Sequence, residues 1–266
     1  MMGYFPDSAR AKSDLRQAIT DRHVWNALAM SDIRSKYRMS TFGSLWITLA
    51  TATLALSIGL IYGQFFGQDI RSYLPYFTAG YVTWIFIASV MGEASTALIA
   101  SGNLIKSSQM PIVFHVLRMV QRNLIVLAHN AIVVVLVWPF IRWPVGPSAL
   151  LSVAGLLLLY AFLIGMAIAL SIVCVRYRDV PPLVQVMTQF LFFVTPIIWQ
   201  PEQLKFGGAV LALNPISYML MIVRDPLLGR PVALETWLIA IVLTAASLTV
   251  GSLMYLRFRN RVAYWV

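Results

Sequence analysis

The residues best suited to bind a ligand form a basic stripe along one predicted helix. His115, Arg118, Arg122 and His129 stand at positions i, i+3, i+7 and i+14. At 100° per residue of an α-helix, they fall within an arc of about 60°. Arginine binds phosphate oxygens through paired, charge-assisted hydrogen bonds, which favours a lipid-linked phosphate at His115, Arg118 and Arg122. Alternatively, the arginines reach lipid headgroups and His129 bonds to a neighbouring helix.

One carboxylate, Glu93, is the only acidic residue within a predicted membrane span. A charge inside a membrane is costly and is by default a functional candidate. Glu93 lies about one turn from the inner end of its span, where a basic partner is within reach. We therefore expect it to pair with Arg118 or Arg122, with a role in transport as the alternative.

Motifs of catalytic and nucleotide-binding sites are missing from the sequence. It contains no G-x-x-x-x-G-K-[ST], no H-E-x-x-H and no G-x-S-x-G. The single cysteine, Cys174, has no His or Cys neighbours in a metal-ligand spacing. We expect that the chain is not an enzyme and holds neither a metal nor a cofactor itself.

Long apolar helices must position these residues. Hydrophobic residues make up 59% of the chain and charged residues only 11%. A helix needs about 20 apolar residues to cross a bilayer, and six stretches approach or exceed that length. They are residues 42–66, 74–98, 116–140, 149–175, 181–200 and 236–256. The sequence predicts an all-α integral membrane protein with six transmembrane helices.

Basic residues indicate how this protein sits in the membrane. Most of the 20 Lys and Arg residues precede the first span, follow the last, or lie in the loops after spans two and four. The positive-inside rule then places residues 1–41 and 257–266 in the cytoplasm, with 42–256 as the transmembrane domain. The net charge of +10 reflects topology and lipid contact, so we expect no nucleic-acid partner.

The segment before the first span has the pattern of an interface helix. In residues 23–40, apolar side chains recur at spacings of three to five among charged ones. A basic amphipathic helix lies in the plane of the membrane interface. The alternative is a charge cluster that only sets the topology.

A second departure from simple spans lies between spans five and six. Residues 206–213 and 216–223 are apolar but too short to cross the membrane, and Asn214-Pro215 separates them. Proline also interrupts span five at Pro196. We expect two short re-entrant helices that act as a gate, with Pro196, Asn214 and Pro215 as its key residues.

Three motifs in order carry a family resemblance. Residues 31–46 read S-D-I-R-S-K-Y-R-M-S-T-F-G-S-L-W, and residues 103–106 read N-L-I-K ahead of Met110-Pro111. R-Y-R-D at 176–179 is followed by Q-x-x-F-x-x-T-P-I at 189–197 and N-P at 214–215. This arrangement resembles the ABC-2 type permeases of bacterial polysaccharide export, in the branch that exports O-antigen and teichoic acid. Met110 stands where the family has Phe.

The resemblance implies a partner and a substrate. Such permeases form homodimers in the bacterial inner membrane and bind two copies of a separate ABC ATPase, which holds ATP and Mg. The substrate is a polysaccharide linked to undecaprenyl pyrophosphate, and both termini are cytoplasmic. The motifs also imply contacts that transmit ATPase motion, at Arg34, Lys36, Tyr37, Arg38, Asn103, Lys106, Ser107 and Pro111.

An aromatic channel would suit such a polymer, because sugar rings stack on aromatic faces while their hydroxyl groups stay hydrated. The candidates for this channel are Tyr62, Phe66, Phe190, Phe193 and Trp199. Two alternatives remain: an ABC-2 exporter of drugs or small lipids, and a secondary carrier that does not use ATP.

Overall fold

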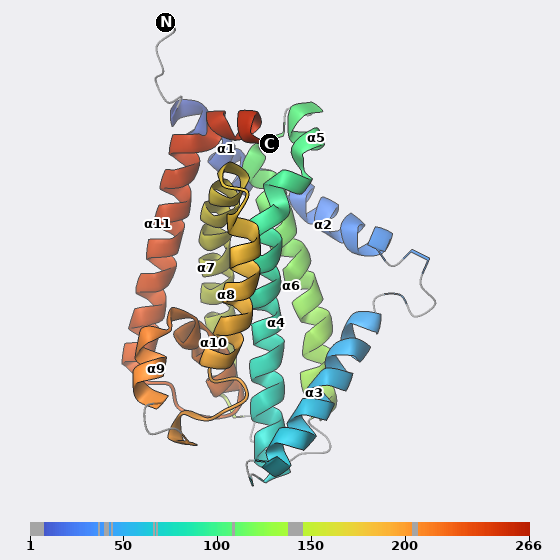
Figure 1. Ribbon diagram of the computed structural model, residues 1–266, viewed down its shortest axis with the longest axis vertical. Helices are drawn as coiled ribbons and strands as arrows, with labels where there is room; N and C mark the ends of the chain where they lie inside the picture. The colour runs from blue at the N-terminus through green and yellow to red at the C-terminus, as the bar shows by residue number, and fades with distance from the viewer. Residues whose placement is uncertain are drawn as a thin grey trace, which may run out of the picture.

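The computed structural model describes residues 8–36, 38–39, 43, 45–65, 67, 69–107, 110–137, 146–203 and 207–266, and these residues form helices without any strand (Figure 1). The helices are α1 (Ser8–Thr20), α2 (Arg22–Lys36), α3 (Leu45–Phe65), α4 (Ile70–Ala100), α5 (Gly102–Ser107), α6 (Ile112–Val137), α7 (Ala149–Arg176), α8 (Val180–Val194), α9 (Gly207–Leu213), α10 (Pro215–Leu227) and α11 (Leu234–Trp265), with a 3₁₀ turn at Pro201–Gln203. The predicted all-α fold class is confirmed.

Five of the described helices are long and apolar enough to cross a membrane: α3, α4, α6, α7 and α11. The predicted fifth span, residues 181–200, differs from the expectation. Its helix α8 has 15 residues and ends at Val194, because Pro196 cannot continue the hydrogen-bond pattern of a helix. The segment predicted as a cytoplasmic tail, 257–266, is helical up to Trp265 as the continuation of α11, and its cytoplasmic placement stays a prediction.

Close packing between α7 and α11 holds one side of the bundle. A Cβ atom on Gly165 would lie 2.4 Å from the backbone of Ser247, and one on Gly251 would lie 2.4 Å from the Gly165 carbonyl oxygen. Any larger residue at these two positions would push the helices apart. Glycine therefore allows the two backbones to touch, as small residues commonly do between membrane helices.

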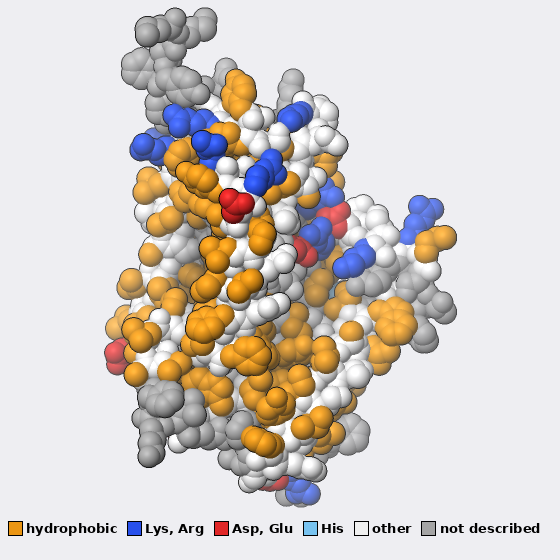
Figure 2. Space-filling model, viewed as in Figure 1, with side chains coloured by type: hydrophobic (Ala, Val, Ile, Leu, Met, Phe, Trp, Pro, Cys, Tyr) orange, Lys and Arg blue, Asp and Glu red, His pale blue; other side chains and the backbone are white. Residues whose placement is uncertain are grey.

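Both ends of the described chain lie at the same end of the bundle, together with α1 and α5 (Figure 1). The Asp14 carboxylate of α1 accepts hydrogen bonds from Tyr255 Oη at 2.8 Å and Arg259 Nε at 2.6 Å, both from α11. We call the end of the bundle that contains α1, α5 and the end of α11 the near end. Several Lys and Arg side chains gather there in Figure 2, while hydrophobic side chains dominate the middle of the visible face. The cytoplasmic placement of this end stays a prediction.

The predicted interface helix corresponds to α2, which runs at an angle to the long helices and packs on α6 (Figure 1). Ala29 and Ile33 are its buried residues, and most of its charged side chains remain exposed. Its helical part ends at Lys36.

The two short helices predicted between spans five and six are present at the opposite end of the bundle, which we call the far end (Figure 1). Helices α9 and α10 meet at an angle of 105°. Asn214 starts α10 by accepting a hydrogen bond from the Ile216 amide at 3.0 Å, and Pro215 occupies the first turn. The sequence Asn-Pro thus ends one helix and begins the next.

Candidate functional site

The predicted basic stripe is part of a polar network at the near end that joins three helices. Asp32 of α2 accepts hydrogen bonds from Arg118 Nε at 2.7 Å and Arg122 Nη1 at 3.2 Å, both on α6. A second nitrogen of Arg118, Nη2, also bonds to Asp32. This forked contact fixes α2 to α6, although the two elements are far apart in the sequence.

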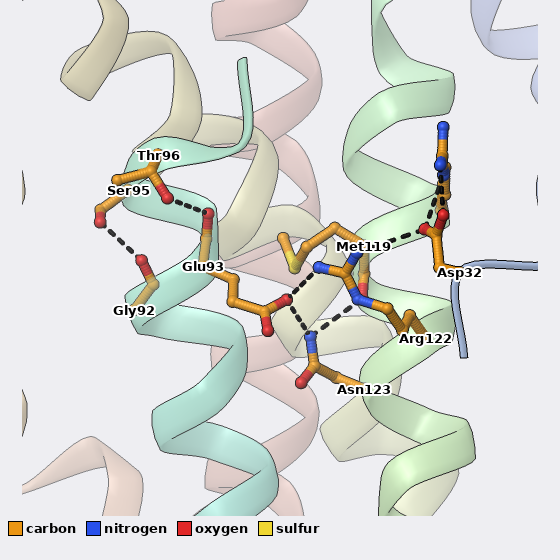
Figure 3. A network of polar contacts seen from close by, with 9 residues as sticks. Asp32, Gly92, Glu93, Ser95, Thr96, Met119, Arg122 and Asn123 are labelled. Atoms are coloured by element: carbon orange, nitrogen blue, oxygen red, sulfur yellow. Dashed lines mark hydrogen bonds and ion pairs between the residues drawn. The ribbon is translucent and has the colours of Figure 1, made fainter. Parts of the chain in front are cut away.

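Arg122 extends the polar network to α4. Its Nη2 donates to Glu93 Oε2 at 2.6 Å, and Asn123 Nδ2 donates to the same oxygen at 2.7 Å. In Figure 3, Arg122 reaches from α6 towards Glu93 and Asp32, which approach it from the two flanking helices. The predicted pairing of Glu93 with Arg118 or Arg122 is confirmed for Arg122.

The charges in the polar network balance, since two carboxylates face two guanidinium groups. Burial alone would raise the pKa of Asp32, but hydrogen bonds and charge from Arg118, with a further contribution from Arg122, lower it below its usual value. Asp32 is therefore ionised at neutral pH. The sequence pattern alone does not reveal the role of Asp32, because its partners lie on another helix, about 90 residues away along the chain.

Beside the polar network is a cavity of about 350 Å³. It lies between α2, α4, α5 and α6, and its lining includes Asp32, Glu93, His115, Arg118 and Arg122. His115 is buried, and its Nε2 atom has no hydrogen-bond partner among the described residues. The three candidates for phosphate binding thus surround one cavity, but both arginines already have carboxylate partners. His129, the fourth residue of the stripe, contacts the Ile125 carbonyl of its own helix at 2.8 Å.

A second hollow, of about 570 Å³, lies between α4 and α8. Aromatic rings and polar side chains line it together, and we call it the aromatic groove. Its main residues are Tyr81, Trp84, Ser89, Thr188, Gln189, Phe192 and Phe193. The Phe192 ring lies 5.9 Å from Trp84 and 5.3 Å from Phe193, between centroids. Stacked Tyr73, Phe77 and Tyr81 continue the aromatic row along α4.

The five channel candidates separate in the structure. Phe193 lines the aromatic groove, whereas Phe190 is exposed elsewhere on α8. Trp199 follows α8, and its indole nitrogen donates to the Phe193 carbonyl at 2.9 Å. Tyr62 lies on α3 beside Phe65, with 6.3 Å between ring centroids. Phe66 lies outside the described residues.

The aromatic row on α4, of which Tyr81 and Trp84 line the groove, was not predicted from the sequence. Tyr73, Phe77 and Tyr81 recur every four residues, and Trp84 follows three residues later. That spacing places all four on one face of a helix and could have revealed the row. An aromatic row within an apolar span is, however, also compatible with membrane anchoring and with ordinary core packing.

The residues predicted to act as a gate meet at the far end. Pro196 is buried directly after α8, and its carbonyl accepts a hydrogen bond from Tyr76 Oη at 3.0 Å. Asn214 Nδ2 donates to Thr195 Oγ1 at 2.9 Å, so the two proline-containing turns are joined. Their gating role stays a prediction.

The predicted ATPase-coupling residues lie mainly on exposed surface at the near end. Arg34, Lys36 and Arg38 are exposed in or directly after α2, and Asn103, Lys106 and Ser107 are exposed on α5. Pro111 is buried before α6, and Tyr37 lies outside the described residues. Helix α5 thus exposes Asn103, Leu104, Lys106 and Ser107, and the coupling role of these regions stays a prediction.

A bundle of apolar helices with an inclined amphipathic helix and a short bent helix pair defines a multi-pass membrane protein. The sequence profile of the ABC-2 type transporter family matches residues 23–228, and the chain belongs to this family. It is similar to two Klebsiella pneumoniae proteins, each named O-antigen export system permease protein RfbA. The first is 22% identical over 239 residues, covering 85% of this chain and 90% of the relative. The second is 21% identical over 202 residues, covering 73% and 76%.

Proposed function

We propose that this chain is the permease subunit of an ATP-driven exporter for a lipid-linked polysaccharide, such as O-antigen on undecaprenyl pyrophosphate. Membership of the ABC-2 family implies a permease that works with an ABC ATPase. The polysaccharide substrate is proposed from the similarity to permeases named for O-antigen export. Two copies of the chain and two ATPase subunits, with ATP and Mg on the ATPase, complete the proposed assembly in the bacterial inner membrane.

The aromatic groove is the observation that carries this proposal. Phe193 is exposed and Tyr81 and Phe192 are partly exposed, so their rings offer faces on which a sugar can stack, while Ser89, Thr188 and Gln189 can bond to hydroxyl groups. A binding site for a drug or small lipid would need fewer polar groups, because such ligands bury mainly apolar surface. The mixture of rings and polar side chains therefore favours a glycan over the alternative small apolar substrates.

The ATPase would bind at the near end and transmit its movement to the permease there. Exposed α5 is suited to dock the ATPase, and α2 lies on the same side of the bundle. The polar network joins α2 to α6 through Asp32, and α6 to α4 through Glu93. Movement of α2 would thus reach α4, which forms one wall of the aromatic groove.

Binding of the lipid pyrophosphate by His115, Arg118 and Arg122 stays a prediction. To bind Arg118 and Arg122, a phosphate in the near-end cavity would have to displace the carboxylates of Asp32 and Glu93 from them. His115 needs no exchange, because its Nε2 atom is unused among the described residues.

Two phenylalanines on α8 provide a matched test of the glycan path. Phe193 is 67% exposed and lines the aromatic groove, whereas Phe190 is 56% exposed and does not. Phe193→Ala should reduce export by about tenfold, equivalent to roughly 1.4 kcal/mol of lost stabilisation, with Phe190→Ala near wild type. Export of lipid-linked glycan by the permease–ATPase complex in proteoliposomes is the measurement. Equal export by the two variants would contradict the proposed path.

A further inference from the structure

One arginine at the far end has no place in the motifs that carry the family resemblance. Arg224 of α10 is 2% exposed, and it is among the largest fully buried side chains among the described residues. A buried cation is costly unless it is paired and hydrogen-bonded. Arg224 meets that requirement with three different partners.

Each partner of Arg224 occupies a different part of its guanidinium group. Nε donates to Asp225 Oδ1 at 2.7 Å, Nη1 donates to the Pro196 carbonyl, and the carbon Cζ lies 4.1 Å from the centroid of the Tyr76 ring. Lysine could not reproduce this arrangement, because its ammonium group lacks both the planar face and the fixed fork of donors.

The segment that Arg224 contacts, residues 195–199, lies outside the regular helices. Its carbonyl groups therefore need other partners, since unpaired backbone groups are costly away from water. Tyr73 Oη donates to the Ile198 carbonyl at 2.7 Å, and the single hydroxyl proton of Tyr76 is shared between the carbonyls of Pro196 and Trp199, each 3.0 Å from its Oη. Side chains from α4 and α10 thus supply the hydrogen bonds that a continued helix would have made.

This segment follows the last turn of α8, which carries two residues of the aromatic groove, Phe192 and Phe193. The Trp199 ring bonds back to the Phe193 carbonyl. A shift of residues 195–199 would therefore move the last turn of α8 and the rings that it carries.

We propose that Arg224 is a positioning residue that holds residues 195–199 between α4 and α10 and thereby fixes the last turn of α8, which carries the groove residues Phe192 and Phe193. Tyr76 acts with it, because the tyrosine hydroxyl and the arginine share the Pro196 carbonyl. Only the consequence for export rests on the proposed function, since the positioning itself can be measured without substrate.

Thiol labelling of residue 198 tests the position of the segment. The buried Cys174 is replaced by serine, and Ile198→Cys places a reporter in the segment. The permease–ATPase complex in lipid nanodiscs is then treated with a water-soluble maleimide. Arg224→Lys should raise the labelling rate by about tenfold, as expected if the segment opens more often after losing a charge-assisted hydrogen bond. Tyr76→Phe should raise it less, because the ring remains beneath the guanidinium group.

Arg230→Ala is the matched control. Arg230 also lies over the Tyr76 ring, with Cζ at 5.1 Å from its centroid, and it is only partly buried. If intact Arg224→Lys complexes are labelled no faster than Arg230→Ala complexes, the proposal is overturned. If Arg224→Lys does not assemble, Tyr76→Phe decides in the same way. Raised labelling together with unchanged glycan export would keep Arg224 as a positioning residue and contradict the role of the groove in export.

Discussion

At the near end, Arg118 and Arg122 are 26% and 30% exposed; both pair with Asp32, and Arg122 also pairs with Glu93. At the far end, Arg224 is 2% exposed and bonds to a backbone carbonyl, an aromatic ring and the adjacent Asp225. The near-end contacts join side chains of separate helices and remain partly solvated, so they can exchange at modest cost. The far-end contacts fix one backbone segment away from water. Arginine thus forms ion pairs between helices that can exchange at the near end, whereas at the far end it holds a backbone segment in one position.

Replacement of the buried arginine should have the largest effect on stability. Arg224→Gln leaves Asp225 without its cation, and breaking a buried ion pair costs about 3–5 kcal/mol. Arg122→Gln should cost roughly 1 kcal/mol, because its ion pairs are partly exposed. Thermal unfolding of the two variants in one detergent compares them. A larger loss for Arg122→Gln would reverse the comparison between the two ends.

Removal of the charge on Asp32 should affect coupling more than stability. Asp32→Asn weakens the link between α2 and α6, so we expect ATP hydrolysis by the complex to persist while glycan export falls by about tenfold. The control is Asp21→Asn, which removes a charge in the turn between α1 and α2 without changing the polar network. Arg34→Ala is not a suitable control, because Arg34 is itself a coupling candidate. The measurement is the amount of glycan exported per ATP hydrolysed, determined on the same preparation.

The same variant sharpens the phosphate prediction. If Arg118 and Arg122 bind the lipid pyrophosphate, Asp32→Asn removes a competitor and should increase the apparent affinity for substrate in the ATPase assay. If the arginines only join helices, that affinity should not change.

Acidification should have the smallest effect. The lowered pKa of Asp32 means that its ionised form stabilises the fold above the usual unfolded-state value of about 3.9. This stabilisation is lost only as the pH falls through the still lower folded-state pKa. The drop in thermal unfolding temperature between pH 8 and pH 5 should therefore be no larger for the wild type than for Asp32→Asn. A clearly larger drop for the wild type would contradict the assigned ion pairs.

Much of the architecture could be predicted because the local composition of a segment determines whether it can insert into a membrane. Long apolar stretches predicted α3, α4, α6, α7 and α11, and the Asn-Pro sequence predicted the break between α9 and α10. The length of α8 was less predictable. An apolar stretch up to Gln200 has the composition of a span, but Pro196 ends the helix and the chain continues without regular structure.

The candidate sites were predicted less completely. The basic stripe of His115, Arg118 and Arg122 was visible because helical spacing is a local property of the sequence. Asp32, the common partner of both arginines, was not, since its distance to them depends on how α2 packs on α6. Arg224 carried a weak signal as a charge beside an apolar stretch, but its partners lie on α4 and after α8.

The sequence by itself determined that this chain is helical and membrane-embedded, which segments are too short to span, and which residues share a helix face. Apolar length, proline and helical periodicity act within a few turns, so they need no knowledge of the fold. The tertiary structure alone decided that Glu93 pairs with Arg122, that Phe193 rather than Phe190 lines the aromatic groove, and that Arg224 holds the end of α8. These outcomes depend on the rotation and tilt of packed helices, where a shift of one residue would exchange a buried partner for lipid.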